Sequence, residues 1–519
     1  MLWKASHGLI AVASRQPASR RTLSTLRRGS TSFSIAIGSS VSKQRVVEKA
    51  REAASPAPRG LSKALDDANG PDAAVILTSR SLAPWLADQD FLSALLHVPG
   101  QPPPEINVLS AVVDGIPWPD APHSLRDGIS VLHGGLASML PDLWGSAQVD
   151  CPSVQPSITV PFPPLRNDSG PLEATIPLAN TVFNNGRPFT MFASRWQSQP
   201  GSPLKLTQKV EKRRQLIVPD LTGTNTTSNR SSRSDISAPL LPITRPRRIV
   251  AGLGNIIRQV EIDGKPAPAS GELEAVIPAL LDARSESAPT TTSTVGPVGV
   301  WALVVPEGVA AATGGEMPRL LRGSAASDYG GGGGLSEWGA AVESSVVMAR
   351  LLASGARLQR ILSGGGGWGL KQGLLSLDPQ VRYSVPDEED VERFIRSFKG
   401  ETSPDDVITP GSYIQFFVEP IHPSQKVSAI NRPEQAGLDF PEVVVGTCDT
   451  AEEGEHSVED GVQVVTDYFG ALSSQGMFIA SPTDTVGSHG MGLSTKIDAP
   501  NCRVEVHGKP RHERDDSSA

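Results

Sequence analysis

The first 47 residues lack acidic side chains altogether, although Asp and Glu together number 55 in the 519-residue chain and the first of them is Glu48. The same stretch carries eight Lys and Arg residues among Ser, Thr, Ala and Leu, and it has no long apolar core. This composition is typical of a mitochondrial transit peptide. We therefore expect residues 1–47 to direct the protein to the mitochondrial matrix, with a basic tail that binds nucleic acid or acidic lipid as the alternative.

Removal of this segment near Arg27 and Arg28, or a little later, would leave a mature chain more acidic than the net charge of -8 of the full sequence. An acidic chain argues against a broad surface for nucleic acid, because the phosphates are themselves negative. The net charge does not exclude a smaller, local basic patch that binds nucleic acid.

Cysteine is scarce as well. The chain has three cysteines, Cys151, Cys448 and Cys502, which lie far apart with no C-x-x-C pair. This spacing suggests neither a disulfide framework nor a zinc cluster, so we expect buried thiols. The nine histidines are scattered, with none at metal-ligand spacing. No apolar run approaches the roughly 18–20 residues that span a bilayer, so we expect no transmembrane segment.

The chain does contain a strand, helix and strand pattern near its start. Residues 72–80 and 106–114 are apolar runs of strand length, and residues 85–97 between them have helical spacing. Two strands joined by a crossover helix favour parallel pairing, which predicts the α/β class. Asp114 ends the second strand, and ligands of such sheets gather beyond the carboxyl ends of strands. Asp114 is thus a candidate ligand-binding residue, with an ordinary Asp-Gly turn as the alternative.

Further runs predict mixed sheets in two halves. An Asn-Gly pair at residues 185–186 between two apolar runs indicates a hairpin. Residues 222–239 are almost without apolar side chains and are typical of a linker. We therefore expect an α/β domain at residues 71–220, a disordered linker at 221–243, a second α/β domain at 244–508 and a polar tail at 509–519.

The second half is predicted to hold a glycine-bearing bulge at Gly252 and Gly254, a buried strand at residues 298–305 and a late strand at 412–419. A helix of roughly seven turns should begin at the N-cap Ser336 and run to the glycines near residue 364. Another helix is expected within residues 457–476.

Two glycine runs flank the long helix. Residues 330–334 match neither the P-loop nor the dinucleotide fingerprint, and a flexible loop is the simpler interpretation. The second run holds a large aromatic side chain and is followed by a cation, which favours a loop facing a small anion. A tight turn that packs the indole in the core is the alternative. The candidate ligand-binding residues here are Gly364, Gly365, Gly366, Gly367, Trp368, Gly369 and Lys371.

The order AAVILTS, INVLSAVVDG, a glycine-rich middle and PGSYIQFF resembles the two-part FIST sensory domains, over about residues 71–420. The resemblance implies an α/β fold and the binding of small ligands such as amino acids. It assigns no functional residue.

The leading hypothesis is a non-catalytic protein of the mitochondrial matrix that binds a small anionic ligand or a protein partner, in the latter case as an assembly factor. Two alternatives stay open. One is an enzyme that acts on a phosphorylated or carboxylated small molecule, with the second glycine run, Lys371 and Asp378 in its site. The other is an RNA-associated factor in mitochondrial gene expression, which would bind in a salt-sensitive manner.

Overall fold

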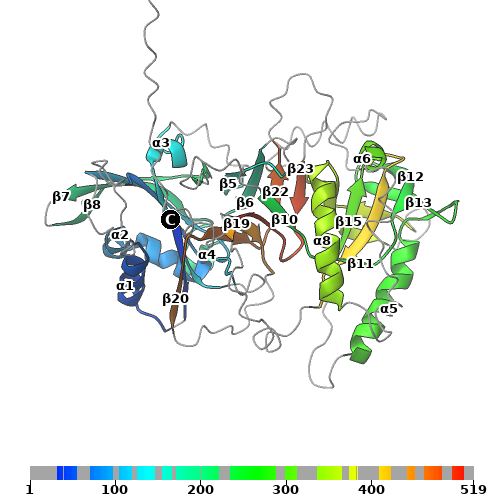
Figure 1. The fold of residues 1–519 in the computed structure, drawn as a ribbon, viewed down its shortest axis with the longest axis horizontal. Helices are drawn as coiled ribbons and strands as arrows, with labels where there is room; N and C mark the ends of the chain where they lie inside the picture. Colours follow the sequence, from blue (N-terminus) through cyan, green and yellow to red (C-terminus); the bar gives the residue numbers. More distant parts are fainter. Residues whose placement is uncertain are drawn as a thin grey trace, which may run out of the picture.

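The fold is that of a computed structural model, which contains four β-sheets with helices packed on them (Figure 1). The described residues are 32–38, 40–54, 71–96, 104–119, 126–145, 155–165, 171–199, 202–220, 234–287, 298–312, 336–364, 373–381, 383, 408–421, 441–449, 461–481 and 494–507.

A seven-stranded mixed sheet lies at one end of the molecule (Figure 1). Its central strands are apolar on both faces, as strands covered on both sides must be. The parallel pair in the sheet is the one predicted from the strand, helix and strand pattern. In spatial order the strands are β20 (Val462–Thr466), β1 (Ser32–Ile37), β4 (Gly128–Gly134), β2 (Ala73–Thr78), β3 (Glu105–Val112), β7 (Met191–Gln199) and β8 (Ser202–Glu211).

Helices cover one face of this sheet, and a separate apolar core fills the space beneath them. Asp88 is the N-cap of the helix Gln89–Leu95, because its carboxylate accepts a hydrogen bond from the backbone N–H of Phe91. Two four-residue helices lie in connections. The helices of this part are α1 (Lys43–Ala54), the 3-10 helix η1 (Arg80–Ala87), α2 (Gln89–Leu95), α3 (Leu136–Met139) and α4 (Val182–Asn185).

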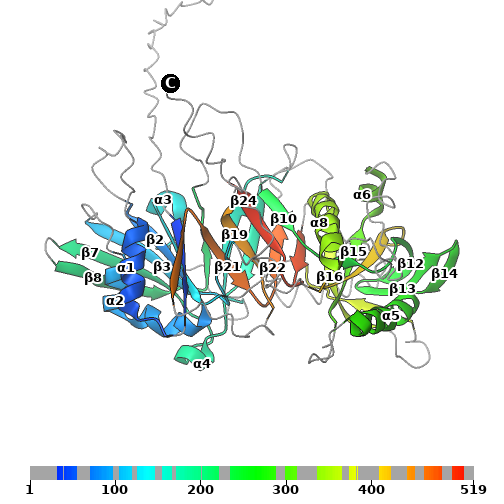
Figure 2. The same ribbon diagram turned by 60° about the horizontal axis from the view of Figure 1, so that its bottom comes forward.

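Two smaller sheets lie in the middle of the molecule (Figure 2). Their apolar side chains join those of the seven-stranded sheet in one large core. The first has the order β23 (Ser494–Ile497), β22 (Met477–Ala480), β6 (Leu172–Pro177), β5 (Ser157–Phe162) and β9 (Arg214–Leu216). The second has the order β10 (Ser234–Ser237), β24 (Arg503–His507), β19 (Pro441–Thr447) and β21 (Phe469–Ser473).

At the other end, six antiparallel strands pair in a closed ring with its own apolar core. Two short strands extend it: β11 (Leu241–Pro242) on the first strand of the ring and β14 (Lys265–Pro268) on the third. The ring runs β18 (Tyr413–Val418), β12 (Arg247–Leu253), β13 (Ile256–Ile262), β17 (Leu375–Leu377), β16 (Arg357–Gly364) and β15 (Val300–Val305), which pairs back to β18.

Among the described residues, three helices belong to this end (Figure 2). Ser336 begins α8 as predicted, because its hydroxyl accepts the backbone N–H of Gly339. Met348 and Leu351 of that helix pack into the large core. The helices are α5 (Gly271–Ser287), α6 (Glu307–Ala312) and α8 (Glu337–Ala353).

The α/β class with mixed sheets is therefore shown, but the chain does not divide into two consecutive halves. From the C-terminal part, β20 pairs with β1 and β22 pairs with β6. The expected linker at residues 221–243 includes β10 and β11, and its residues 221–233 fall outside the described ranges, as does the expected tail at 509–519. The fold also begins earlier than Pro71, at β1 and α1, so residues 32–47 of the expected targeting segment belong to it.

Three local predictions were wrong. The long helix ends at Ala353, because Gly355 takes a φ of 102° and the chain then enters β16. The expected helix within residues 457–476 is instead β20 and β21, whose valines suit a strand. The Asn-Gly pair near residue 185 ends the short helix α4, with Gly186 at a φ of 75°, and the flanking β6 and β7 belong to different sheets.

Of the two glycines expected to form a bulge, Gly254 lies instead in the turn between β12 and β13, with a φ of 61°. The register of the pair also shifts beside Gly252, so a bulge is present there. Among the described residues, no helix has the length and apolar character that crossing a membrane requires.

Candidate functional site

Asp114 lies where the sequence pattern predicts, beyond the carboxyl end of β3. The parallel strand β2 ends beside it, and Arg80 follows that strand. Backbone hydrogen bonds join the loop after β3 to β21: Asp114 N–H donates to Leu472, and Leu472 N–H donates to Gly115. A residue from the first quarter of the chain is thereby tied to one close to its end.

A second parallel pair ends at the same place. β19 and β21 run parallel, and Thr447 lies opposite Ser473 at their carboxyl ends. Cys448 follows the first strand and Ser474 follows the second, and the backbone N–H of Cys448 donates to the carbonyl of Ser473. The carboxyl ends of two parallel pairs therefore meet, which brings Arg80, Asp114, Cys448 and Ser474 together. We call these four residues the junction.

The Asp114 carboxylate holds the junction closed. Its Oδ2 accepts the backbone N–H of Ser474 at 2.7 Å and the hydroxyl of Ser474 at 3.0 Å. Its Oδ1 lies 3.4 Å from Nε of Arg80, and only 2% of the Asp114 side chain is exposed. Both oxygens are thus in contact with groups of the protein itself, as is usual for a buried carboxylate.

The thiols of the described part are buried. Burial raises the pKa of Cys448 well above its usual value, and the nearby carboxylate of Asp114 adds to the shift. Burial also raises the pKa of Cys502. A thiol of raised pKa stays protonated at neutral pH and is a poor nucleophile. Within the described ranges, no three His, Cys, Asp or Glu side chains are grouped as a metal ion would need.

The glycine run near the indole can be placed only at its first residue. Gly364 ends β16, where a Cβ atom would lie 2.4 Å from Cδ2 of Leu375, so a larger residue would have to displace the end of that leucine side chain. Gly365, Gly366, Gly367, Trp368, Gly369 and Lys371 lie outside the described residues. Gly364 belongs to the ring and Asp114 to the seven-stranded sheet, so these two candidates are not brought together.

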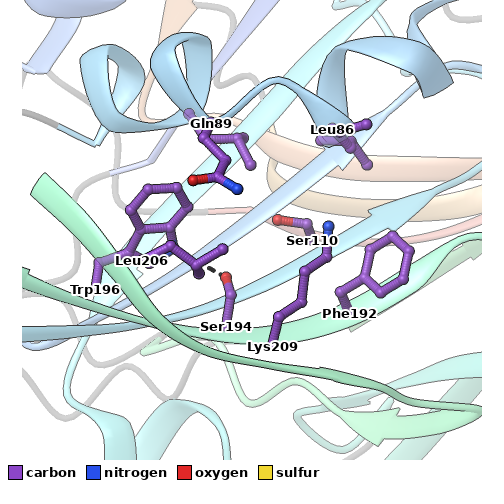
Figure 3. A pocket seen from close by; sticks show the side chains of 10 residues that line it. Leu86, Gln89, Ser110, Phe192, Ser194, Trp196, Leu206 and Lys209 are labelled. Atoms are coloured by element: carbon purple, nitrogen blue, oxygen red, sulfur yellow. Dashed lines mark hydrogen bonds between the residues drawn. The ribbon is translucent and has the colours of Figure 1, made fainter.

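A hollow does open on the helix-covered face of the seven-stranded sheet, between α2 and the strands β3, β7 and β8 (Figure 3). Its empty space is about 270 Å³ when the mouth that is open to solvent is counted, but the centre of a water molecule can occupy only about 10 Å³ of it. We call it the Lys209 hollow. Its walls are Leu86, Ala87, Gln89, Leu92, Ser110, Phe192, Ser194, Trp196, Leu206 and Lys209.

Polar groups point into the Lys209 hollow from several elements (Figure 3). The hydroxyl of Ser194 is used, since it accepts the indole N–H of Trp196 at 3.0 Å. The hydroxyl of Ser110 differs, because it is buried and makes no hydrogen bond to any described residue. Such a group costs about 1–3 kcal/mol relative to a satisfied one. It is therefore a vacant donor at the bottom of the hollow.

Two cations lie against the ring of Phe192, which lines the hollow; of the two, only Lys209 is itself part of the lining. Nζ of Lys209 lies 4.0 Å from the ring centre of Phe192, and Cζ of Arg187 lies 5.0 Å from the same ring. Burial of the ammonium group, followed by the charge of Arg187, lowers the pKa of Lys209. The carboxylate of Glu211 pairs with Arg187 at 2.9 Å and not with Lys209. An anion in the mouth would relieve the repulsion between the two cations.

Little in the sequence indicates this hollow. Ser110 is the single hydroxyl residue inside an apolar strand, which is the one signal that was visible. Lys209 lies nearly 100 residues further along the chain, and only the pairing of β7 with both β3 and β8 brings the two together. Comparison of the chain with protein-family models, with curated proteins and with solved structures finds no match to any of them.

Proposed function

We propose that this protein binds, without chemical conversion, a small molecule that carries a carboxylate or phosphate group, and that the Lys209 hollow is the binding site. The observation that carries the proposal is the buried, unpartnered hydroxyl of Ser110 beneath a lysine. A hydroxyl and an ammonium group are both donors, and carboxylate and phosphate oxygens accept from both.

The dimensions of the hollow restrict the ligand. The hollow has room for about one water molecule between its walls, so it admits an oxygen of the head group and little more. The body of the ligand would lie in the wider mouth, against Phe192 and Leu206. An apolar or aromatic body is expected there, since ligand sites are mainly apolar with a few placed polar groups.

The non-catalytic character rests on the side chains that are present. The hollow contains no carboxylate, histidine or cysteine to act as base or nucleophile. The junction holds a thiol of raised pKa and a carboxylate whose oxygens are both engaged. The resemblance to FIST sensory domains points in the same direction, toward ligand binding.

Thermal-shift measurements with benzoate, hexanoate, phenyl phosphate and inorganic phosphate test the proposal. A ligand at about 100 times its Kd stabilises the folded state by about 2.7 kcal/mol. We expect a rise in Tm for the wild type that is lost in Ser110→Ala and Lys209→Met. Lys205→Met is the matched control, because Lys205 also lies on β8 but does not line the hollow. An equal response in all four proteins, or turnover of a probe, would refute the proposal.

We further propose that the protein acts in the mitochondrial matrix, on the strength of the acid-free, Arg-rich N-terminal segment. Because β1 is a buried strand, removal of the targeting segment must occur before Ser32 if the sheet is to stay complete. Residues 1–31 fused to a fluorescent protein should reach mitochondria, and the same segment with its arginines changed to glutamine should not. Import of the glutamine version would contradict this assignment.

A further inference from the structure

The strand β8 is the outer edge of the seven-stranded sheet. Within the described ranges it pairs with β7 alone, and eight of its ten residues are exposed, all except Leu204 and Leu206. In Figures 1 and 2 the β7–β8 hairpin extends away from the rest of the molecule. Its outer backbone N–H and C=O groups are therefore open to an added strand, which is how several protein modules bind extended peptides.

This edge is basic although the chain as a whole is acidic. From Arg187 to Arg214 the sequence has seven Lys and Arg residues and one acid, Glu211. Within the described part, Lys205, Lys209 and Lys212 have no carboxylate partner. Lysines on an edge strand also discourage aggregation, but a role of that kind alone does not require arginines on the neighbouring turns and strand.

The arginines of this region are already held against aromatic rings. Arg195 lies 4.6 Å from the ring centre of Trp144, and Arg213 lies 5.1 Å from that of Phe189. Arg187 shares the ring of Phe192 with Lys209. Phe189 and Phe192 are also buried, so their rings are not available for stacking with bases. The surface thus fits an acidic polypeptide better than single-stranded RNA.

The lysines stand on both faces of the edge strand. Lys205 lies opposite Gln197 and Lys209 lies opposite Ser194. Positions three residues apart on β7 face opposite sides of the sheet, so the two lysines do as well. An added strand with acidic residues at consecutive positions would meet a cation on either face.

We propose that β8 binds an acidic segment of a partner protein, which pairs with the edge as an additional strand. The partner is recognised by its charge and its extended backbone. This surface shares only Leu206 and Lys209 with the Lys209 hollow, and the backbone edge and the other lysines that carry the proposal lie outside it, so it does not depend on the small-molecule proposal.

The test uses a fluorescein-labelled decapeptide in which pairs of glutamates alternate with single valines, and fluorescence anisotropy as the readout. We expect binding that weakens with salt and weakens roughly tenfold in the double variant Lys205→Glu and Lys212→Glu. Lys209 is unchanged in that variant, so benzoate or phosphate binding in the hollow can be measured in the same protein. The matched control is Arg258→Glu with Lys265→Glu, which makes the same change in charge on the distant strands β13 and β14.

A second probe separates strand pairing from general attraction between charges. The same decapeptide with every second amide N-methylated keeps its charge but loses the donors that an edge requires. Weaker binding of the methylated peptide by tenfold or so supports the proposal. Equal binding of the two peptides, equal loss in the control variant, or tighter binding of a single-stranded RNA dodecamer than of the peptide would each overturn it.

Discussion

The carboxylate of Asp114 provides the sharpest test of how the seven-stranded sheet is joined to the pair β19 and β21. Replacement by alanine removes the acceptor for two hydrogen bonds from Ser474 and the partner of Arg80. Hydrogen bonds to a charged group contribute about 1.5–3 kcal/mol each, and removal of one member of a buried ion pair costs about 3–5 kcal/mol. Because the side chain of Arg80 is 29% exposed and water can reach it, we expect a total loss of about 3–4 kcal/mol.

The loss should be measured as the free energy of unfolding in urea, with tryptophan fluorescence as the probe. Asp114→Asn keeps one acceptor oxygen but not the charge, so it should lose about half as much as Asp114→Ala. Asp235→Asn is the control, because Asp235 is an exposed residue on β10 and such changes stay within about 0.5 kcal/mol. If Asp114→Ala lowers the free energy of unfolding no more than the control does, the junction does not hold the seven-stranded sheet and the pair β19 and β21 together.

Three further predictions concern other parts of the fold. Both polar atoms of the Gln359 side-chain amide are buried without a partner in the described part. Gln359→Met should therefore raise the free energy of unfolding by about 1–3 kcal/mol. A decrease in that free energy would mean that the amide is hydrogen-bonded in the folded protein. The thiols of Cys448 and Cys502 should resist a disulfide reagent at pH 8 until the protein is unfolded. Stability should also fall as pH rises above the ordinary thiol pKa of 9.0, because the unfolded chain then releases protons that the folded chain retains, and Cys448→Ala should reduce this pH dependence. A chain that starts at Ser32 should fold with native circular dichroism, whereas one that starts at Val41 lacks β1 and should not.

The local elements with strong periodicity were predictable from sequence. The runs that became β2, β3, β15 and β18 are continuous apolar segments of strand length, and burial on both faces explains that pattern. Ser336 was recognised as an N-cap because its chemistry is local. Asp114 was placed at a carboxyl end for the same reason, since the parallel pairing of β2 and β3 follows from a short crossover.

The parts that failed depend on contacts between distant residues. Nothing near Val462 indicates that it pairs with Ile37, and without that partner its valines fit a helical pattern as well as a strand. The Lys209 hollow is of the same kind, because Ser110 and Lys209 share it only through the intervening β7. The glycine run between β16 and β17 contributes a single described residue, Gly364, which lies against the end of the Leu375 side chain.

The pairing of β1 with β20 also bears on how the protein is made. β1 is among the first folded segments to be synthesised, and its partner on one side is completed only when nearly the whole chain has emerged. Until then one edge of β1 has no partner strand. The seven-stranded sheet therefore cannot be completed as an N-terminal domain that folds before the rest of the chain is made. Contacts so far apart in the chain make folding slow and favour association with other chains in the meantime. Newly made protein should therefore require a chaperone for most of its synthesis or import, and the late strand β20 should be the step that releases it.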